Sequence, residues 1–259
     1  MIILTIDTDW APHEATASVL NKVRALGIKT TVFFSAPSPV PYWPLLEVGA
    51  HPDLSRRHVP SDGGGPMSMA TMEHDRDVQK AESDILSAFR VSIPEAECVR
   101  THRFYWHSDL ARVMAKNGFL YDSSMILPYL PGIRGFKVGN LTRWPVWASD
   151  HLHLLRRFPL DRLEMPYLDE PGLKIFCFHV TYLHLNVRSL ADFNMISKRL
   201  SPGQSPPEPR TGAGIWTLFE LLAGKIAKTS QGCWLRDIPE SWLLNNLALP
   251  ENPAEDAPK

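Results

Sequence analysis

The sequence has few cysteines, almost no net charge and no long apolar segment. Its three cysteines, Cys98, Cys177 and Cys233, are widely spaced, which excludes a metal knuckle and predicts reduced core residues. With 27 basic and 28 acidic residues, the chain lacks the positive field that nucleic acid or an anionic bilayer would require. No apolar run reaches the roughly 18 residues of a membrane span, and no secretory signal opens the chain. We therefore expect a soluble cytoplasmic protein that binds no nucleic acid and is not an integral membrane protein.

The sequence does contain strand-like and helix-like segments in alternation. Apolar and β-branched residues fill positions 2–6 without a break, which predicts a buried strand. Apolar residues at helical spacing follow and end at Gly27, and residues 29–35 again favour a strand. Further strands are predicted at 45–50, 98–102, 119–121, 141–146, 173–178 and 233–235, and further helices at 73–89, 109–116, 190–200 and 215–226. This alternation favours a parallel α/β sheet, either closed as a barrel or doubly wound.

The length and composition predict one domain. The chain has 259 residues, of which 44% are hydrophobic, so it can bury a full core. We expect this domain to span residues 1–248 and to be followed by a flexible polar tail over 249–259. Residues 128–139, which contain proline and glycine, are expected to form a loop.

The first predicted strand ends in two acidic residues, Asp7 and Asp9. Side chains alternate along a strand, so both carboxylates point to the same side if the extended geometry continues through Thr8. The carboxyl ends of parallel strands are where α/β proteins place their sites. Two carboxylates so close together raise the pKa of one of them or bind a cation. The alternative is that Asp9 caps the following helix and Asp7 is a solvated loop residue.

Three histidines, His51, His102 and His179, lie at or directly after the ends of predicted strands. A single histidine in such a position is more often a packing or surface residue. Three of them are expected to converge with the two aspartates, because the carboxyl ends of the strands meet at one mouth. One carboxylate with two or more imidazoles and an open position suits zinc or a similar divalent metal.

The same residues carry a resemblance to a known family. The matching segments are, in chain order, Thr5-Ile6-Asp7-Thr8-Asp9, residues 27–34, Glu47-Val48-Gly49-Ala50-His51, Arg100, residues 117–123 and Phe176-Cys177-Phe178-His179. In this order they resemble the motifs of the polysaccharide deacetylase domain, the NodB-homology fold of carbohydrate esterase family 4, over almost the whole chain. The resemblance implies a distorted (β/α) barrel of about seven parallel strands. It also implies a metal-dependent hydrolase of amide bonds.

The resemblance gives catalytic roles to three residues. Asp7 would be the general base, and Arg100 would hold it ionised and oriented through a charge-assisted pair. His179 would protonate the leaving amine. Without the resemblance, a structural ion pair at a strand end is an equally good explanation for Arg100.

By the same resemblance, Asp9 and His51 would be metal ligands. The family's second histidine normally follows the first by one turn, whereas the next histidine here is His58, seven positions after His51. The third ligand is therefore either His58 or His102, with His58 slightly favoured. The cofactor is expected to be a divalent metal, with zinc as the first choice.

Aromatic residues near the expected mouth predict a wall for a sugar ring. Trp10 directly follows the carboxylates, and Trp106 follows the strand end at His102; these three are the predicted substrate-binding residues. Trp144 and Trp147 could also stack on a sugar, although burial in the core explains Trp144 equally well.

The expected substrate is an amino sugar that carries an acetyl or formyl group. Asp7 and Asp9 are separated by one residue, as in a branch of the family that acts on nucleotide-linked or lipid-linked sugars. A cytoplasmic location favours such a precursor of surface polysaccharide or lipopolysaccharide over a finished polymer. Two alternatives stay open: a non-catalytic carbohydrate-binding relative that has lost a ligand in residues 53–72, and an Asp-x-Asp phosphatase, which Ala11 and Pro12 fit poorly.

Overall fold

The computed structural model describes residues 1–9, 11–56, 69–197, 206–230 and 232–244. The strands are β1 (Ile2–Asp7), β2 (Thr30–Phe34), β3 (Leu46–Ala50), β4 (Cys98–Val99), β5 (Tyr121–Asp122), β6 (Phe136–Val138), β7 (Leu141–Arg143), β8 (Ala148–Ser149) and β9 (Lys174–His179). The helices are α1 (His13–Ala25), α2 (Met69–Ser92), α3 (Leu110–Lys116), α4 (Asp150–Leu155), α5 (Val180–Leu185), α6 (Leu190–Ser197) and α7 (Ile215–Ala227). Three short 3-10 helices are η1 (Leu54–Arg56), η2 (His102–Phe104) and η3 (Glu240–Trp242). The expected tail over 249–259 lies outside the described residues.

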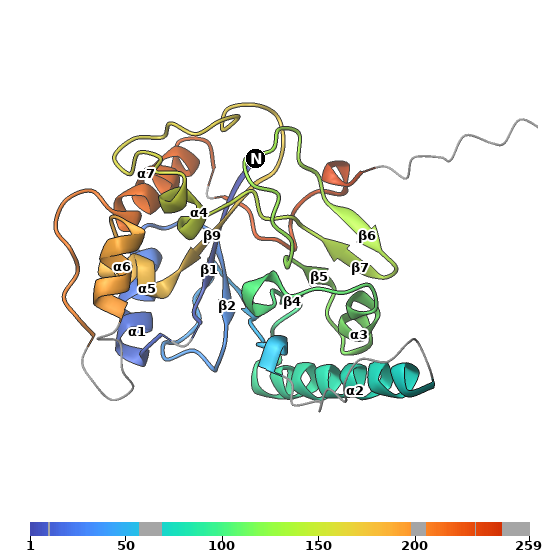
Figure 1. The fold of residues 1–259 in the computed structure, drawn as a ribbon. Helices are drawn as coiled ribbons and strands as arrows, with labels where there is room; N and C mark the ends of the chain where they lie inside the picture. Colours follow the sequence, from blue (N-terminus) through green and yellow to red (C-terminus); the bar gives the residue numbers. More distant parts are fainter. Residues whose placement is uncertain (10, 57–68, 198–205, 231, 245–259) are drawn as a thin grey trace, which may run out of the picture.

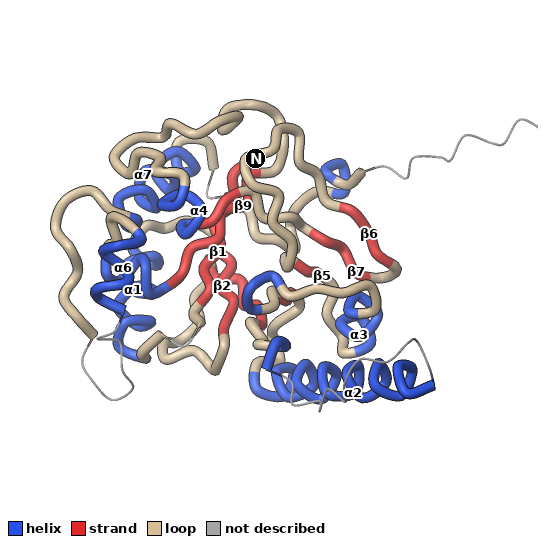
Figure 2. The backbone as a smooth tube through the Cα atoms, viewed as in Figure 1, coloured by secondary structure: helices blue, strands red, loops and turns tan. Residues whose placement is uncertain are grey.

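The strands form one curled sheet in the order β6-β7-β5-β4-β3-β2-β1-β9-β8 (Figures 1 and 2). The edge pair β6 and β7 is antiparallel, and every other neighbouring pair is parallel. Because β6 and β8 are the two edges, the sheet is an open half-barrel. The expected α/β fold with a barrel-like parallel sheet is confirmed, with more strands than predicted.

Strand β1 holds the central position, between β2 and β9. Its residues from Ile3 to Asp7 are buried, as the unbroken apolar run predicts. The register places Asp7 opposite Phe33 on β2 and opposite His179 on β9. Since these strands run parallel, their carboxyl ends form a single edge, and the polar residues that follow each strand meet there.

Helices pack on both sides of the central strands. In Figure 1, α1, α5, α6 and α7 lie on the β9 side, whereas α2 and α3 lie near β4 and β5. Helix α1 buries Val19, Leu20 and Val23 at helical spacing, so one apolar stripe faces the core. The chain leaves α1 through Gly27, whose φ of 64° suits a residue without a Cβ atom. Among the described helices, none is both long and apolar enough to cross a membrane.

Three local predictions differ from the structure. Strand β6 lies inside the segment 128–139 that was expected to be a loop, where it pairs as an edge strand with β7. Helices α4 and α5, of six residues each, were not predicted because they are too short for a helical period to show. Residues 233–235 form no strand; instead, the backbone N–H groups of Leu235 and Arg236 donate to the buried carboxylate of Glu47 at 2.8 and 3.1 Å.

Candidate metal centre and active site

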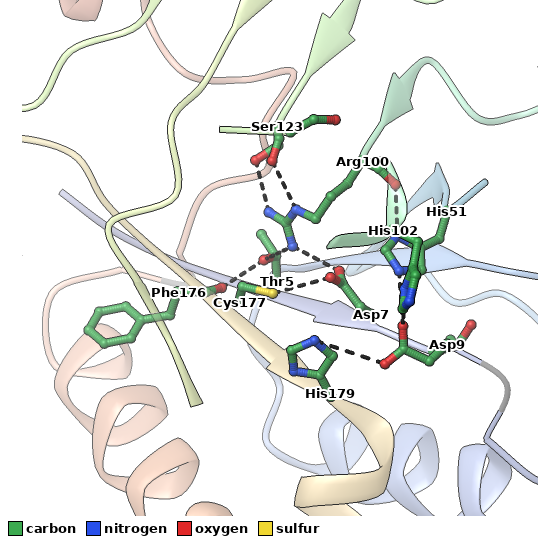
Figure 3. A network of polar contacts seen from close by, with 12 residues as sticks. Thr5, Asp7, Asp9, His51, Arg100, His102, Ser123, Phe176, Cys177 and His179 are labelled. Carbon is green, nitrogen blue, oxygen red and sulfur yellow. Dashed lines mark hydrogen bonds and ion pairs between the residues drawn. The ribbon is translucent and has the colours of Figure 1, made fainter. Parts of the chain in front are cut away.

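The carboxyl ends of β1, β3, β4 and β9 bring together most of the predicted site residues (Figure 3). Asp7 and His179 are the last residues of β1 and β9 and lie opposite each other in register. Asp9 follows two positions later, with a φ of 43° that an aspartate tolerates better than most residues. His51 directly follows β3, and Arg100 directly follows β4.

Asp9, His51 and His102 form a compact group. The Oδ1 atom of Asp9 lies 3.0 Å from Nε2 of His51 and 3.2 Å from Nδ1 of His102. One possible ligand atom from each residue lies within 4.8 Å of the other two, so the three could hold a metal ion. The Nδ1 atom of His51 lies 2.7 Å from the carbonyl oxygen of Arg100, which fixes the ring with Nε2 toward Asp9.

This group fits a divalent cation. One carboxylate with two imidazoles is a ligand set of catalytic metal sites that keep an open position. A metal-binding histidine usually donates its other N–H group to a carbonyl or carboxylate, as His51 can to Arg100. Burial alone would raise the pKa of Asp9, but His179 and the hydrogen bonds from His102 and His51 lower it well below its usual range. Asp9 is therefore ionised and available to a cation.

The buried carboxylate of Asp7 is paired with Arg100. The Nη1 atom of Arg100 donates to Oδ1 of Asp7 at 2.8 Å and to the hydroxyl of Thr5 at 2.7 Å. Its Nε and Nη2 atoms donate to the carbonyl and hydroxyl oxygens of Ser123 at 3.1 and 2.8 Å. The thiol of Cys177 donates to the other oxygen of Asp7 at 3.2 Å. Burial would raise the pKa of Asp7, but the guanidinium of Arg100 makes the net shift a lowering.

His179 is held by Asp150, a residue that sequence analysis missed. The carboxylate of Asp150 lies 2.7 Å from Nδ1 of His179 and accepts the backbone N–H of the same residue, also at 2.7 Å. The Nε2 atom of His179 then faces the site, 3.9 Å from Oδ2 of Asp9. Burial would lower the pKa of His179, but the carboxylates of Asp150 and Asp9 raise it to about 10. His179 is therefore protonated at neutral pH.

Of the tryptophans that were predicted to contact a sugar, the structure describes Trp106, Trp144 and Trp147. Trp106 is half-buried, and the guanidinium of Arg143 covers its ring at 3.3 Å from the centroid. Trp144 and Trp147 are core residues, 2% and 0% exposed, so they cannot stack on a sugar. Trp10 lies outside the described residues.

The histidine that the sequence slightly favoured as third ligand, His58, also lies outside the described residues. The sequence assigned His102 to substrate binding, with metal ligation as the alternative. In the structure its ring lies against the carboxylate of Asp9.

A signal for Asp150 was present in the sequence. Ser149 precedes it, and the Ser149 hydroxyl accepts the N–H of Leu152 at 3.2 Å, so a Ser-Asp pair after an apolar run marks both a strand end and a helix start.

The strand ends thus bring together an Asp-His-His group that could hold a metal ion, a buried carboxylate paired with an arginine, and a histidine paired with a carboxylate. The profile of the WbmS-like polysaccharide deacetylases matches residues 4–197, and the chain belongs to this family. The matched range includes the candidate site residues from Asp7 to His179, and the match confirms the resemblance seen in the sequence motifs.

One solved structure shows the same fold, and a second is a weaker match. A protein of Bordetella bronchiseptica, provisionally assigned as a polysaccharide deacetylase of O-antigen biosynthesis, has a TM-score of 0.71 at 19% identity, over 86% of this chain and 90% of that one. A provisionally assigned deacetylase of Mycobacterium smegmatis has a TM-score of 0.42 at 13% identity, over 90% of this chain and 92% of that one. The sequence has no match among curated proteins.

Proposed function

We propose that the protein is a metal-dependent hydrolase that removes an acetyl or formyl group from the nitrogen of an amino sugar in surface-polysaccharide synthesis. The observation that carries the proposal is the position of the group formed by Asp9, His51 and His102. It lies between Asp7, which is bound by Arg100, and His179, which is bound by Asp150. Membership of the deacetylase family supports the reaction class. The O-antigen assignment of the Bordetella protein supports the substrate class.

Asp9, His51 and His102 would hold the metal, for which zinc is the first candidate. When bound, a divalent ion polarises the amide carbonyl and lowers the pKa of a water molecule. Asp7 is the general base: its carboxylate is ionised, and it sits two residues before the ligand Asp9 on the same strand end. Arg100 keeps Asp7 ionised and fixes its orientation, because the guanidinium that binds Asp7 is itself anchored by three further hydrogen bonds, to Thr5 and Ser123.

His179 is the general acid. During hydrolysis the acyl carbon gains the water oxygen and the carbon–nitrogen bond breaks. The water proton passes to Asp7, and the Nε2 proton of His179 passes to the amine that stays on the sugar. Asp150 keeps the proton donor in place, because its carboxylate binds Nδ1 and leaves Nε2 directed at the site.

The test measures metal content and acyl release together. The purified full chain is loaded with zinc, and release of acetate or formate from N-acyl amino sugars is followed for the wild type and for Asp9→Asn. We expect Asp9→Asn to lose both bound metal and activity, whereas Asp84→Asn, an exposed carboxylate on α2, retains both. Activity that persists after Asp9→Asn has lost the metal would refute the role of Asp9. Binding of an amino sugar without turnover by the metal-loaded wild type would favour a non-catalytic relative.

A further inference from the structure

A groove of about 490 Å³ is lined by residues of α4, of the segment after it and of the start of α6. Both helices lie on the β9 side of the sheet (Figure 1). Its apolar lining includes Leu154, Leu155, Phe158 and Leu190, and two exposed arginines, Arg157 and Arg188, stand on it. An apolar floor with two guanidinium groups suits a ligand that is apolar on one face and doubly anionic at one end.

The charges of Arg157 and Arg188 are not neutralised within the described part of the chain, where neither guanidinium forms an ion pair. Asp192 accepts the backbone N–H of Arg188 at 3.3 Å. Its side chain is paired with Arg210, whose Nη2 and Nε atoms both lie 3.1 Å from Oδ1 of Asp192. The groove therefore presents two uncompensated positive charges.

Side-chain contacts connect this groove to the general acid. The ring of Tyr182 lies 5.6 Å from that of His179, and its hydroxyl bonds to Nδ1 of His151 at 3.1 Å. His151 and Leu155 are four residues apart on α4, so they lie on one helix face, about 6 Å apart along the helix axis.

The opposite wall follows the same geometry. Phe193 of α6 stacks on the ring of Tyr182 at 4.3 Å between centroids, and Leu190 lies one turn before Phe193 on the same helix. Tyr182 thus contacts His179 and also one residue of each helix that lines the groove, His151 of α4 and Phe193 of α6.

We propose that the α4–α6 groove is a subsite for a phosphate ester attached to the amino sugar. The inference rests on the proposed function, in which His179 protonates the amine that remains on the sugar. The sugar and whatever it carries then lie next to His179, whose ring contacts Tyr182, a residue that also contacts both helices lining the groove. A phosphoryl group carries up to two negative charges, which matches the two arginines, and the apolar floor accommodates the nucleoside or lipid beyond it.

The test compares a charged with an uncharged substrate. Deacetylation of N-acetylglucosamine 1-phosphate and of N-acetylglucosamine is measured for the metal-loaded wild type and for Arg157→Asn/Arg188→Gln. Asparagine is chosen because Arg157 has a φ of 57°, a conformation that asparagine readily adopts. We expect the double variant to lower kcat/KM for the phosphorylated sugar about tenfold or more and to leave the neutral sugar within about twofold.

A matched control is Arg24→Gln, an exposed arginine on α1, which should change neither substrate. Equal losses for both substrates, or no loss for either, would overturn the subsite. Octyl phosphate and uridine monophosphate, used as competitive inhibitors, separate a lipid carrier from a nucleotide carrier. If the wild type hydrolyses no substrate, the proposed function fails. Calorimetric titration of the full chain with glucose 1-phosphate then tests the groove alone, and equal binding by wild type and double variant would exclude it.

Discussion

Replacing Arg100 with methionine should cost more stability than any surface change, because it leaves a buried carboxylate without its partner. Arg100 is 0% exposed and Asp7 2% exposed, and the N–O distance between them is 2.8 Å. Breaking one partner of a buried, hydrogen-bonded ion pair costs about 3–5 kcal/mol. We expect Arg100→Met to lower the free energy of unfolding by that amount at neutral pH, as measured by equilibrium unfolding in urea. Arg24→Met, on the surface of α1, should change it by less than about 0.5 kcal/mol.

The pH dependence of this loss follows from the carboxylate of Asp7. In the wild type its pKa is lowered, so it contributes stability above its unfolded value of 3.8, and this is lost as pH falls through the folded value. In Arg100→Met, burial no longer has an opposing guanidinium and raises the pKa of Asp7, so the charged form is penalised as pH rises. The stability difference between variant and wild type should therefore be largest near neutral pH and shrink in acid.

A double-mutant cycle isolates the pair. Asp7→Asn/Arg100→Met removes the stranded charge, so it should be more stable than Arg100→Met alone, with a coupling free energy of about 1–3 kcal/mol. A loss below about 1 kcal/mol for Arg100→Met, or strictly additive effects in the cycle, would refute the claim that Arg100 exists to hold Asp7 ionised.

Three further variants test other parts of the structure. Gly49→Ala should destabilise by about 1–3 kcal/mol in the same urea assay, because a Cβ atom there would lie 2.6 Å from the Phe33 ring and 2.8 Å from the Cys98 sulfur; a neutral effect would contradict this packing. Burial raises the pKa of Glu47 above 4.5. The stability of the wild type relative to Glu47→Gln should therefore be highest below pH 4.5 and should fall as pH rises through the pKa of Glu47 in the folded protein. A difference that does not change with pH would show that Glu47 is not desolvated. Zinc at a thousand times its dissociation constant should stabilise the wild type by about 4 kcal/mol in thermal unfolding, and Asp9→Asn should lose this; equal gains would place the metal elsewhere.

Sequence reasoning succeeded where one physical rule decides the geometry. Parallel strands align their carboxyl ends, so Asp7, Asp9, His51 and His179 could be placed at one mouth from strand positions alone. Family membership followed from the order of the same motifs.

The sequence could not reveal the residues on short elements that hold the site side chains in place, such as Asp150, which binds His179. Asp150 lies between a two-residue strand and a six-residue helix, and neither is long enough to show a period. The burial of Trp147 depends on its packing against Phe176 and Tyr129, which are distant in sequence. The role of Glu47 was hidden for the same reason, because the backbone groups that it accepts lie 188 and 189 residues away.

The site pairs the carboxylate of Asp7 and the imidazole of His179 with partners of opposite charge that come from different elements. Arg100, after β4, holds Asp7 negative from inside the sheet. Asp150, at the start of α4, holds His179 positive from the helix side. Asp9 lies between them, so the five side chains leave one uncompensated negative charge beside two imidazoles. That balance favours binding of a divalent cation by Asp9, His51 and His102, the ligand set of the proposed hydrolase.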